Sequence, residues 1–241
     1  MCDSCGCHTA DEPNNSRTVD VHESLLAANT RQALENRQHF ESMGAVAINL
    51  ISGPGSGKTT LLEHTIKNLR NELSIAVIEG DIETERDADR IRKQGAPAVQ
   101  ITTGGACHLD ARLVHKGLHR LQHENAAEQY DIIFIENVGN LVCPATFDLG
   151  EHTRIVLISV PEGSDKPAKY PKAFTSSNCF LITKTDLLPY FDFSIDEAAA
   201  EARKLNPKLK IMELSSTTGE GFSEWLNYLR RIAGKQHPEK S

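Results

Sequence analysis

The sequence feature that most constrains the fold is a glycine-rich run between an apolar segment and a helical pattern. Residues 46–51 are apolar enough to form a buried strand, and residues 59–73 show helical spacing. Between them stands the run Gly53-Pro54-Gly55-Ser56-Gly57-Lys58-Thr59. Glycines let consecutive backbone amides point at one centre, and a helix that begins there adds the positive end of its dipole. A strand, a glycine-rich loop and a helix in this order predict a phosphate-binding loop, or P-loop.

The same run predicts how a nucleotide is held. Lys58 is expected to reach the β- and γ-phosphates, and the Thr59 hydroxyl to bind Mg²⁺. Ser52 stands where the pattern G-x-x-x-x-G-K-S/T has its first glycine, and because serine is small we expect the loop to tolerate it. The residues predicted to contact the nucleotide here are Gly53, Pro54, Gly55, Ser56, Gly57, Lys58, Thr59 and Thr60.

The rest of the chain alternates short apolar runs with helical patterns. The predicted strands are residues 46–51, 74–79, 98–101, 130–136, 154–160, 178–183 and 210–214. The predicted helices are residues 59–73, 84–94, 109–124, 196–205 and 222–233. This alternation predicts an α/β protein of the P-loop NTPase class, with a mostly parallel central sheet flanked by helices. Ligands of such sheets bind at the carboxyl ends of the strands.

Three regions are expected along the 241 residues. Residues 1–18 are polar and rich in cysteine, which predicts a flexible metal-binding tail. Residues 19–44 predict an amphipathic helix, because apolar residues recur at helical spacing between Val21 and Met43 and Gly44 ends the pattern. This helix would pack against the main domain or against a partner. Residues 45–241 then form the nucleotide-binding (G) domain.

Two acidic residues are candidates for holding magnesium and positioning water. Glu136 ends the apolar run YDIIFIE, and Asp81 follows the run SIAVIEG. A carboxylate at a strand end beside the P-loop suits Mg²⁺ or its water shell, although either acid could instead cap a helix or face solvent. Together with Lys58 and Thr59 they are the expected catalytic residues, and Gly139 could offer a backbone amide to a γ-phosphate.

A second motif indicates which base is bound. Thr183-Lys184-Thr185-Asp186 resembles the guanine motif N-K-x-D, with threonine in place of asparagine. Asp186 can accept hydrogen bonds from the two donors of guanine, N1 and N2, whereas adenine would leave this carboxylate unpaired. Farther along, Ser215, Ser216 and Thr217 resemble a loop that contacts the guanine carbonyl, and the Lys184 stem can lie over the base. GTP and GDP are therefore the predicted nucleotides.

Soft donor atoms form a separate group. Cys107 and His108 are adjacent in the sequence, and Cys143 lies seven residues beyond Glu136. Thiolate and imidazole suit Zn²⁺ and Ni²⁺ rather than Mg²⁺. Three ligands do not close a structural zinc site, so water or a second subunit would complete the coordination. The alternative is a pair of ordinary thiols beside an incidental histidine. If GTP draws Gly139 inward, Cys143 should move with it, so that metal affinity differs between nucleotide states.

The first seven residues hold three further thiols, Cys2, Cys5 and Cys7. With a free Cys2 amine they would present one nitrogen and three sulfurs, a set that suits planar Ni²⁺ better than tetrahedral Zn²⁺. Vacant thiols on a frayed terminus are the alternative. Cys179 lies in an apolar run and is predicted to be a core residue. The histidines His108, His115, His119 and His123 are interpreted as the polar surface of one helix, not as a nickel store.

Charge and hydrophobic pattern exclude several classes of function. The net charge of −7 argues against a nucleic-acid partner, which needs a basic face. No apolar run approaches the roughly 18 residues of a membrane-spanning helix, and the N-terminus lacks the basic and apolar parts of a secretory signal. These features predict a cytoplasmic protein, no membrane contact and reduced cysteines.

Taken together, these motifs resemble the HypB family of hydrogenase nickel-incorporation GTPases over nearly the whole chain. The resemblance rests on the tail CxxCGC, the P-loop PGSGKTT, EGD, TGGACH, ENVGNLVCP, EGSDKPxKYP and the pair TKTD and SSTTGEG. It implies slow intrinsic GTP hydrolysis, a homodimer promoted by nucleotide or metal, and transfer of nickel to the large subunit of nickel–iron hydrogenase with a partner metallochaperone. It further implies a tight nickel site at Cys2, Cys5 and Cys7 and a weaker nickel or zinc site at Cys107, His108 and Cys143. Lys166 and Lys169 match the family pattern without an assigned role.

Two other functions compete with this one. A urease-type nickel-insertion GTPase belongs to the same superfamily but carries a Cys-Pro-His motif, whereas Cys107 and His108 are contiguous here. A metal-storage or sensor protein with a regulatory nucleotide site belongs to a different class. The intact Lys58, Thr59 and Glu136 argue against it.

Overall fold

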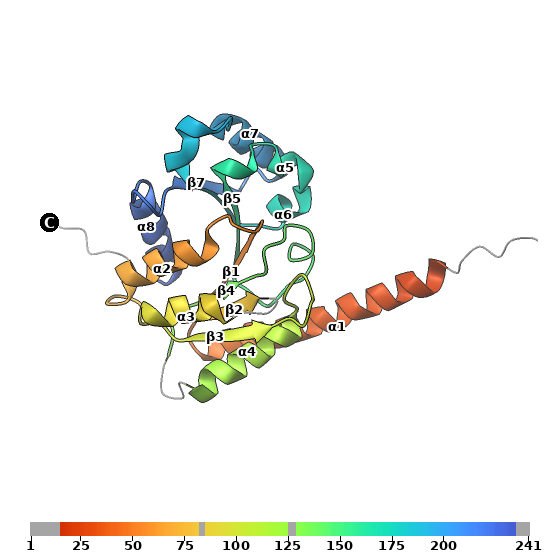
Figure 1. The fold of residues 1–241 in the computed structure, drawn as a ribbon. Helices are drawn as coiled ribbons and strands as arrows, with labels where there is room; N and C mark the ends of the chain where they lie inside the picture. Colours follow the sequence, from red (N-terminus) through yellow and green to blue (C-terminus); the bar gives the residue numbers. More distant parts are fainter. Residues whose placement is uncertain (1–14, 82–84, 125–128, 235–241) are drawn as a thin grey trace, which may run out of the picture.

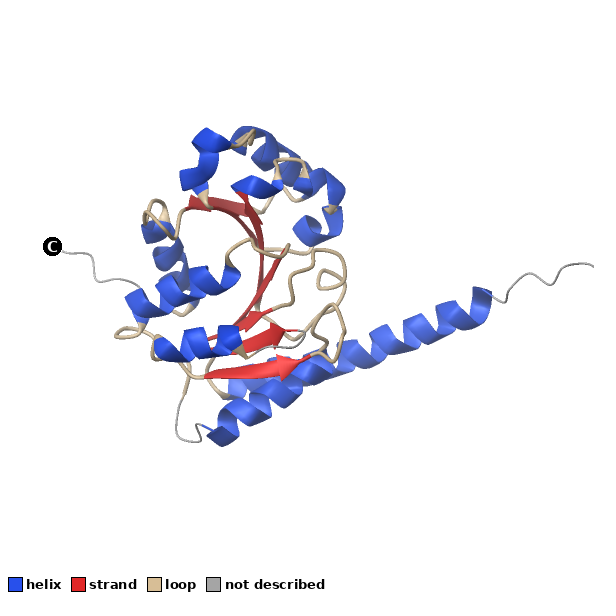
Figure 2. Cartoon of the chain, in the orientation of Figure 1, coloured by secondary structure: helices blue, strands red, loops and turns tan. Residues whose placement is uncertain are grey.

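The sheet of this protein is entirely parallel. A computed structural model of the chain describes residues 15–81, 85–124 and 129–234, with side chains from residue 25 onward. Within these residues seven strands form one sheet in the order β3-β2-β4-β1-β5-β6-β7. Figures 1 and 2 show the twisted sheet between its helices. The strands are β1 (Val46–Ser52), β2 (Ile75–Asp81), β3 (Ala98–Thr102), β4 (Ile132–Glu136), β5 (Thr153–Ser159), β6 (Cys179–Thr183) and β7 (Lys210–Leu214).

The register of the central strands brings three chain segments together at one edge. Leu50 of β1 is level with Glu136 of β4, and Glu136 is level with Glu79 of β2. Since β1 runs directly into the glycine-rich loop, the carboxyl ends of β2 and β4 lie beside that loop. The sheet order itself therefore places two glutamates next to the predicted phosphate site.

Three helices cover one face of the sheet: α2 (Lys58–Leu69), α3 (Arg86–Lys93) and α8 (Phe222–Ile232). Their apolar residues, among them Leu62 and Ile66, are buried against β1, β2 and β4. Trp225 of α8 is fully buried in the same cluster. Its indole N–H donates to Thr65 Oγ1 over 2.8 Å, which ties α8 to α2. A buried indole that keeps its hydrogen bond adds apolar area without an unpaired donor.

The opposite face carries α1 (Asn15–Ser42) and α4 (Ala111–Glu124) over one half of the sheet, and α5 (Lys166–Lys169), α6 (Pro171–Thr175) and α7 (Ile195–Leu205) over the other. Two short 3₁₀ segments, η1 (Val160–Glu162) and η2 (Thr185–Tyr190), follow β5 and β6. The second half of α1 packs on the domain, since Ala33 and Phe40 are buried. Its first half projects away from the body (Figure 1). None of the described helices is long and apolar enough to cross a bilayer.

The predicted class and sheet are confirmed, and the differences concern helix ends and two short helices. All seven predicted strands are present at nearly the predicted bounds. Helix α1 begins at Asn15, so residues 15–18, assigned to the flexible tail, are helical, and α2 ends at Leu69 rather than at residue 73. The helices α5 and α6 were not predicted, because each is only about one turn long and has a proline near its start. Residues 1–14 lie outside the described part of the chain, so the tail prediction stays a prediction.

Candidate nucleotide and metal site

The glycine-rich loop adopts a conformation that only glycine reaches without strain. Gly55 and Gly57 have φ values of +74° and +95°, in the left-handed region that other residues avoid. The loop wraps toward the start of α2, where Lys58 and Thr59 are buried. The Lys58 ammonium donates to Ser52 Oγ over 2.8 Å, and Ser56 Oγ donates to the same atom over 2.5 Å. The serine at the first motif position thus holds Lys58 inside the loop, a role that its small size alone did not predict.

The loop forms one wall of a cavity of about 390 Å³. The structure brings together there most of the predicted nucleotide residues, with Asp81, Glu136, Gly139 and Lys184 from other segments. Three further charged residues line the cavity and were not among the predicted site residues: Glu79, Asp87 and Arg90. Arg90 is paired with Glu63 and Asp87 at 2.6 and 3.0 Å. The cavity therefore combines an amide-rich loop and two lysines with an acidic floor.

Two buried carboxyl groups form that floor. Glu136 Oε1 accepts a hydrogen bond from Thr59 Oγ1 over 2.8 Å, and Glu79 lies beside Glu136 on the next strand. Burial, and then the neighbouring Glu136, raise the pKa of Glu79 well above its usual value, and burial also raises the pKa of Glu136. Among the described residues, Oε2 of each glutamate has no hydrogen-bond partner. A hydroxyl and two carboxylates with free oxygens fit Mg²⁺, which prefers hard oxygen ligands.

Sequence reasoning proposed Asp81 for this task and missed Glu79. The structure places Asp81 at the end of β2, where it lines the cavity. Glu79 stands two residues earlier, inside the strand, and only the pairing of β2 with β4 sets it beside Glu136. The available signals were the glutamate's position within an otherwise apolar strand run and its place in the motif EGD.

The predicted base-binding segments are tied to the P-loop. Thr183, which replaces the usual asparagine, donates from Oγ1 to the Ser56 carbonyl over 2.7 Å and so makes the contact that joins the two loops. Lys184 has a φ of +59° and donates to the Gly55 carbonyl over 2.7 Å. Ser215 Oγ donates to Asp186 Oδ1 over 2.5 Å. Of the base-binding residues, only Lys184 also lines the phosphate cavity. Ser216 and Thr217 follow Ser215 in the same loop, where the Thr217 amide donates to Ser215 Oγ over 3.2 Å.

The three soft donors converge as predicted. Cys107 Sγ lies 3.2 Å from Cys143 Sγ and 3.8 Å from His108 Nδ1, and the three ligand atoms are within 4.8 Å of one another. The His108 ring stacks on Phe147 at a centroid distance of 4.2 Å, which fixes its orientation. Three donors with one side open suit exchangeable Ni²⁺ or Zn²⁺. Cys179 is buried in β6, where burial raises its thiol pKa to about 12, so its assignment to the core is confirmed.

One short segment links this triad to the nucleotide cavity. It begins at Glu136 and ends at Cys143, a span we call the linking segment. Gly139 packs so closely on the P-loop that a Cβ there would lie 2.9 Å from Pro54 Cα. Asn140 forms an isolated antiparallel bridge with Ser52, and its Nδ2 donates to the Cys107 carbonyl over 3.3 Å. The candidate nucleotide-binding and metal-binding residues are therefore joined by a continuous set of contacts.

The remaining predicted residues lie elsewhere. Lys166 and Lys169 stand on α5, where Lys166 Nζ lies 5.6 Å from the centre of the Tyr170 ring and Lys169 pairs with Asp165 at 2.5 Å. Neither lysine lines the nucleotide cavity. Cys2, Cys5 and Cys7 fall outside the described residues.

Comparisons with known proteins agree on one family. The model of the CobW/HypB/UreG nucleotide-binding domain matches residues 47–213. The hydrogenase maturation factor HypB of Azotobacter chroococcum is 48% identical over 221 residues, which cover 92% of this chain and 71% of that protein. The hydrogenase/urease maturation factor HypB of Helicobacter pylori is 41% identical, covering 91% of this chain and 90% of that one. The crystal structure of HypB from Helicobacter pylori in complex with nickel superposes with a TM-score of 0.81 at 39% identity, covering 89% of this chain and 100% of that one.

Proposed function

The chain belongs to the HypB family of hydrogenase maturation factors, within the CobW/HypB/UreG group of nucleotide-binding proteins, and on this premise we propose that it is a GTP-hydrolysing nickel metallochaperone. In this role it delivers nickel to the large subunit of nickel–iron hydrogenase during maturation. The observation that carries the proposal is the linking segment, which contacts the P-loop through Gly139 and supplies Cys143 to the soft-donor triad.

The proposal assigns GTP binding and slow hydrolysis to the residues of the cavity and of the base-binding segments. In it, the P-loop amides and Lys58 hold the phosphates, and Asp186, outside the cavity, accepts the hydrogen bonds of guanine. Mg²⁺, held by Thr59, Glu136 and Glu79 or Asp81, would neutralise charge on the β- and γ-phosphate oxygens. Glu136 is also proposed to orient a water near the γ-phosphate. Arg90 is the cationic side chain of the cavity wall besides the two lysines, but Glu63 and Asp87 already engage it. Hydrolysis without a free arginine is expected to be slow.

The triad of Cys107, His108 and Cys143 is proposed as the exchangeable nickel site of the G domain, with Zn²⁺ as its competitor. Its donors are partly accessible, with Cys107 exposed and Cys143 half-buried, so cargo can enter and leave. Because three donors leave the coordination incomplete, a homodimer that pairs two triads would complete it. Cys2, Cys5 and Cys7 are proposed as the tighter nickel site of the tail. The proposal also includes two protein partners, a partner metallochaperone and the hydrogenase large subunit. It places the protein in the cytoplasm.

A second destination for the nickel is supported by one observation. The Helicobacter pylori relative is named a hydrogenase/urease maturation factor, so urease is a candidate acceptor alongside hydrogenase. A storage or sensor protein with a merely regulatory nucleotide site is less well supported, because a purely regulatory pocket does not require the buried Glu79 and Glu136 beside Thr59.

The proposal is tested by measuring nickel affinity of the full chain with GDP and with a non-hydrolysable GTP analogue. We expect a difference of 5-fold or more, on the order of the coupling between linked sites. Lys58→Ala should abolish both GTP hydrolysis and the difference, and Cys143→Ala should weaken nickel binding by the G domain in either state. Lys67→Ala, an exposed lysine on the same helix, is the matched control. Equal nickel affinities in the two states, or phosphate release that survives Lys58→Ala, would refute the proposal.

A further inference from the structure

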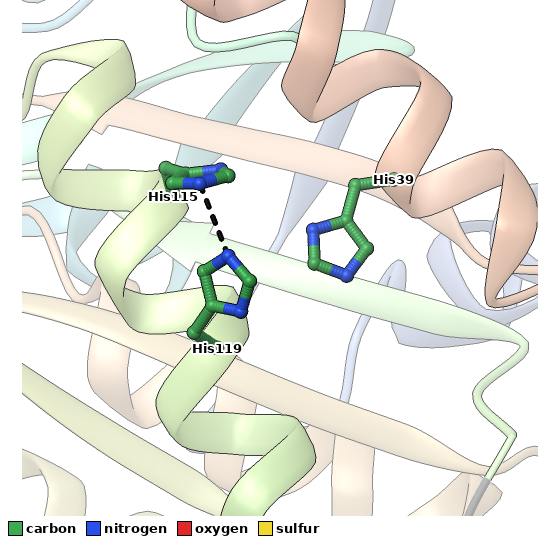
Figure 3. Close-up of side chains that lie close together, drawn as sticks. All are labelled: His39, His115 and His119. Carbon is green, nitrogen blue, oxygen red and sulfur yellow. Dashed lines mark hydrogen bonds between the residues drawn. The ribbon is translucent and has the colours of Figure 1, made fainter.

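Three imidazoles from two helices meet outside the nucleotide cavity and the cysteine triad. His39 comes from α1, and His115 and His119 stand one turn apart on α4. Figure 3 shows the His39 ring facing the other two across the gap between the helices. One nitrogen of each ring lies within 4.8 Å of the others, and His115 Nε2 is 3.0 Å from His119 Nε2. The sequence predicted only an ordinary polar helix surface for His115 and His119. Their partner His39 is distant in the chain, so no local pattern linked it to them.

A buried asparagine determines which nitrogen of His115 is free. Asn36 of α1 is fully buried, and its amide nitrogen donates to the carbonyls of Ala111 and Leu149 over 2.7 and 3.0 Å. Its Oδ1 must therefore be the atom that faces His115 Nδ1 at 3.2 Å, and an oxygen of this kind only accepts. His115 Nδ1 consequently carries the proton. In the neutral ring this leaves the lone pair on Nε2, the atom that faces His119.

This arrangement is the one found around metal-bound histidines. A ligating imidazole usually donates its other N–H to a fixed acceptor, which sets both the tautomer and the ring orientation. Two nitrogens at 2.0–2.1 Å from one ion in tetrahedral geometry lie roughly 3.3 Å apart. The observed 3.0 Å between His115 Nε2 and His119 Nε2 is close to that separation. His39 would need only a small ring adjustment to add a third nitrogen, since its ring centroid is 5.3 Å from that of His119.

We propose that His39, His115 and His119 form a further metal site between α1 and the G domain, which takes a divalent transition ion such as Zn²⁺, Ni²⁺ or Co²⁺. Neutral imidazoles suit this class of ion, and three of them leave a coordination position for water. The site is separate from the thiol ligands. An ion there would bridge α1 and α4 and hold α1 against the domain.

The test uses the full chain with Cys2, Cys5, Cys7, Cys107 and Cys143 all replaced by alanine, so that the thiol ligands are gone. Titration with Co²⁺ and with Zn²⁺ should show about one ion per chain, and the Co²⁺ spectrum should lack the sulfur-to-metal charge-transfer band. His119→Ala in this background should lower metal affinity at least 10-fold, and His39→Ala should do the same. Because His119 is exposed, its replacement is not expected to disturb folding.

His123→Ala is the matched control, since His123 is exposed on the same helix and does not join the cluster. It should bind as the parent does. Zn²⁺ should also raise the thermal midpoint of the parent and of the control but not that of His119→Ala, because a ligand that binds only the folded state stabilises it. No metal bound by the thiol-free parent, or unchanged affinity in both His39→Ala and His119→Ala, would overturn the site. Either result leaves the nickel function of the cysteines standing, since that function is measured on the chain that contains them.

Discussion

At the scale of single residues, Glu79 shows what a buried carboxyl group does in this cavity. Its side chain is 2% exposed and one of its oxygens lacks a partner among the described residues. Burial and the adjacent Glu136 raise its pKa, because both disfavour the charged carboxylate. An acid whose pKa is raised on folding stabilises the fold below its unfolded pKa, and this contribution is lost as the pH rises through the folded pKa. At high pH Glu79 therefore lowers the stability of the empty protein, and the same carboxylate is available to bind a cation.

Glu79→Gln is expected to stabilise the empty chain. In the absence of Mg²⁺ and nucleotide, the free energy of unfolding at pH 8 should rise by roughly 1–3 kcal/mol, because the amide has no charge to bury. The difference should shrink as the pH falls toward 5, because the raised pKa favours the protonated, neutral carboxyl of the wild type in that direction. Magnesium-dependent GTP binding should weaken at the same time. Urea unfolding between pH 5 and pH 8 with a chelator measures the first effect.

Glu213→Gln is the control for this change, because Glu213 also lies in a strand but is exposed. Its unfolding curves should follow those of the wild type at every pH. A pH dependence in Glu79→Gln identical to that of the wild type would show that Glu79 does not titrate as inferred.

Residues whose role follows from local spacing could be predicted, and residues whose role depends on register could not. Lys58 and Thr59 follow from the loop pattern, and the convergence of Cys107 with Cys143 was expected because both follow strands. Glu79 is positioned by the pairing of β2 with β4, which no local pattern encodes. The cluster of His39 with His115 depends likewise on how α1 crosses α4.

At the scale of elements, alternation of apolar runs with helical patterns predicted the strands because a parallel sheet buries both of its faces. The ends of the helices were less predictable. Helix α1 begins earlier than its apolar pattern, since its first half projects from the domain and has no core face to mark it. The contacts that hold α1 on the domain lie in its second half. There Arg37 donates to the carbonyls of Gly150 and Glu151, and Gly150 packs against the α1 backbone.

Gly150→Ala should loosen α1 from the domain. Gly150 has a φ of +87°, and a Cβ there would lie 2.4 Å from the Ala33 carbonyl oxygen. We expect a loss of about 2–4 kcal/mol in unfolding free energy from the combined strain and overpacking, measured by urea unfolding. Gly44→Ala is the control, because Gly44 has a φ of +70° but nothing within 4 Å of its Cβ position. If Gly150→Ala lost no more unfolding free energy than Gly44→Ala, α1 would accommodate the added methyl group without a measurable free-energy penalty.

At the scale of the whole molecule, the linking segment connects the proposed nucleotide and metal sites through one set of contacts. Glu136, Gly139, Asn140 and Cys143 touch, in turn, Thr59, Pro54, Cys107 and again Cys107. Thermodynamic linkage requires that whatever nucleotide does to metal affinity, metal does equally to nucleotide affinity. The projecting half of α1 lies outside this set of contacts.

Gly139→Ala should disturb the coupling more than the fold. Its Cβ would press on the Pro54 backbone, which must shift, so GDP affinity should fall about 10-fold, equivalent to about 1.4 kcal/mol. The nickel affinities with GDP and with the GTP analogue should become more alike. Calorimetric titrations of nucleotide and of nickel measure both. Gly117→Ala provides the comparison, because its Cβ would meet the Ile78 side chain at the same 2.9 Å but away from the linking segment. Coupling reduced equally in both variants would point to general loosening.

The hydrogen bond between Trp225 and Thr65 has a practical consequence. Trp225 is the one tryptophan of the sequence, and it is sealed against α2, the helix that begins at Lys58. All indole fluorescence of the protein thus originates from one fully buried side chain that packs on α2. Emission should shift to longer wavelength only when water enters between α2 and α8, so the chain reports on that interface optically, without any attached dye.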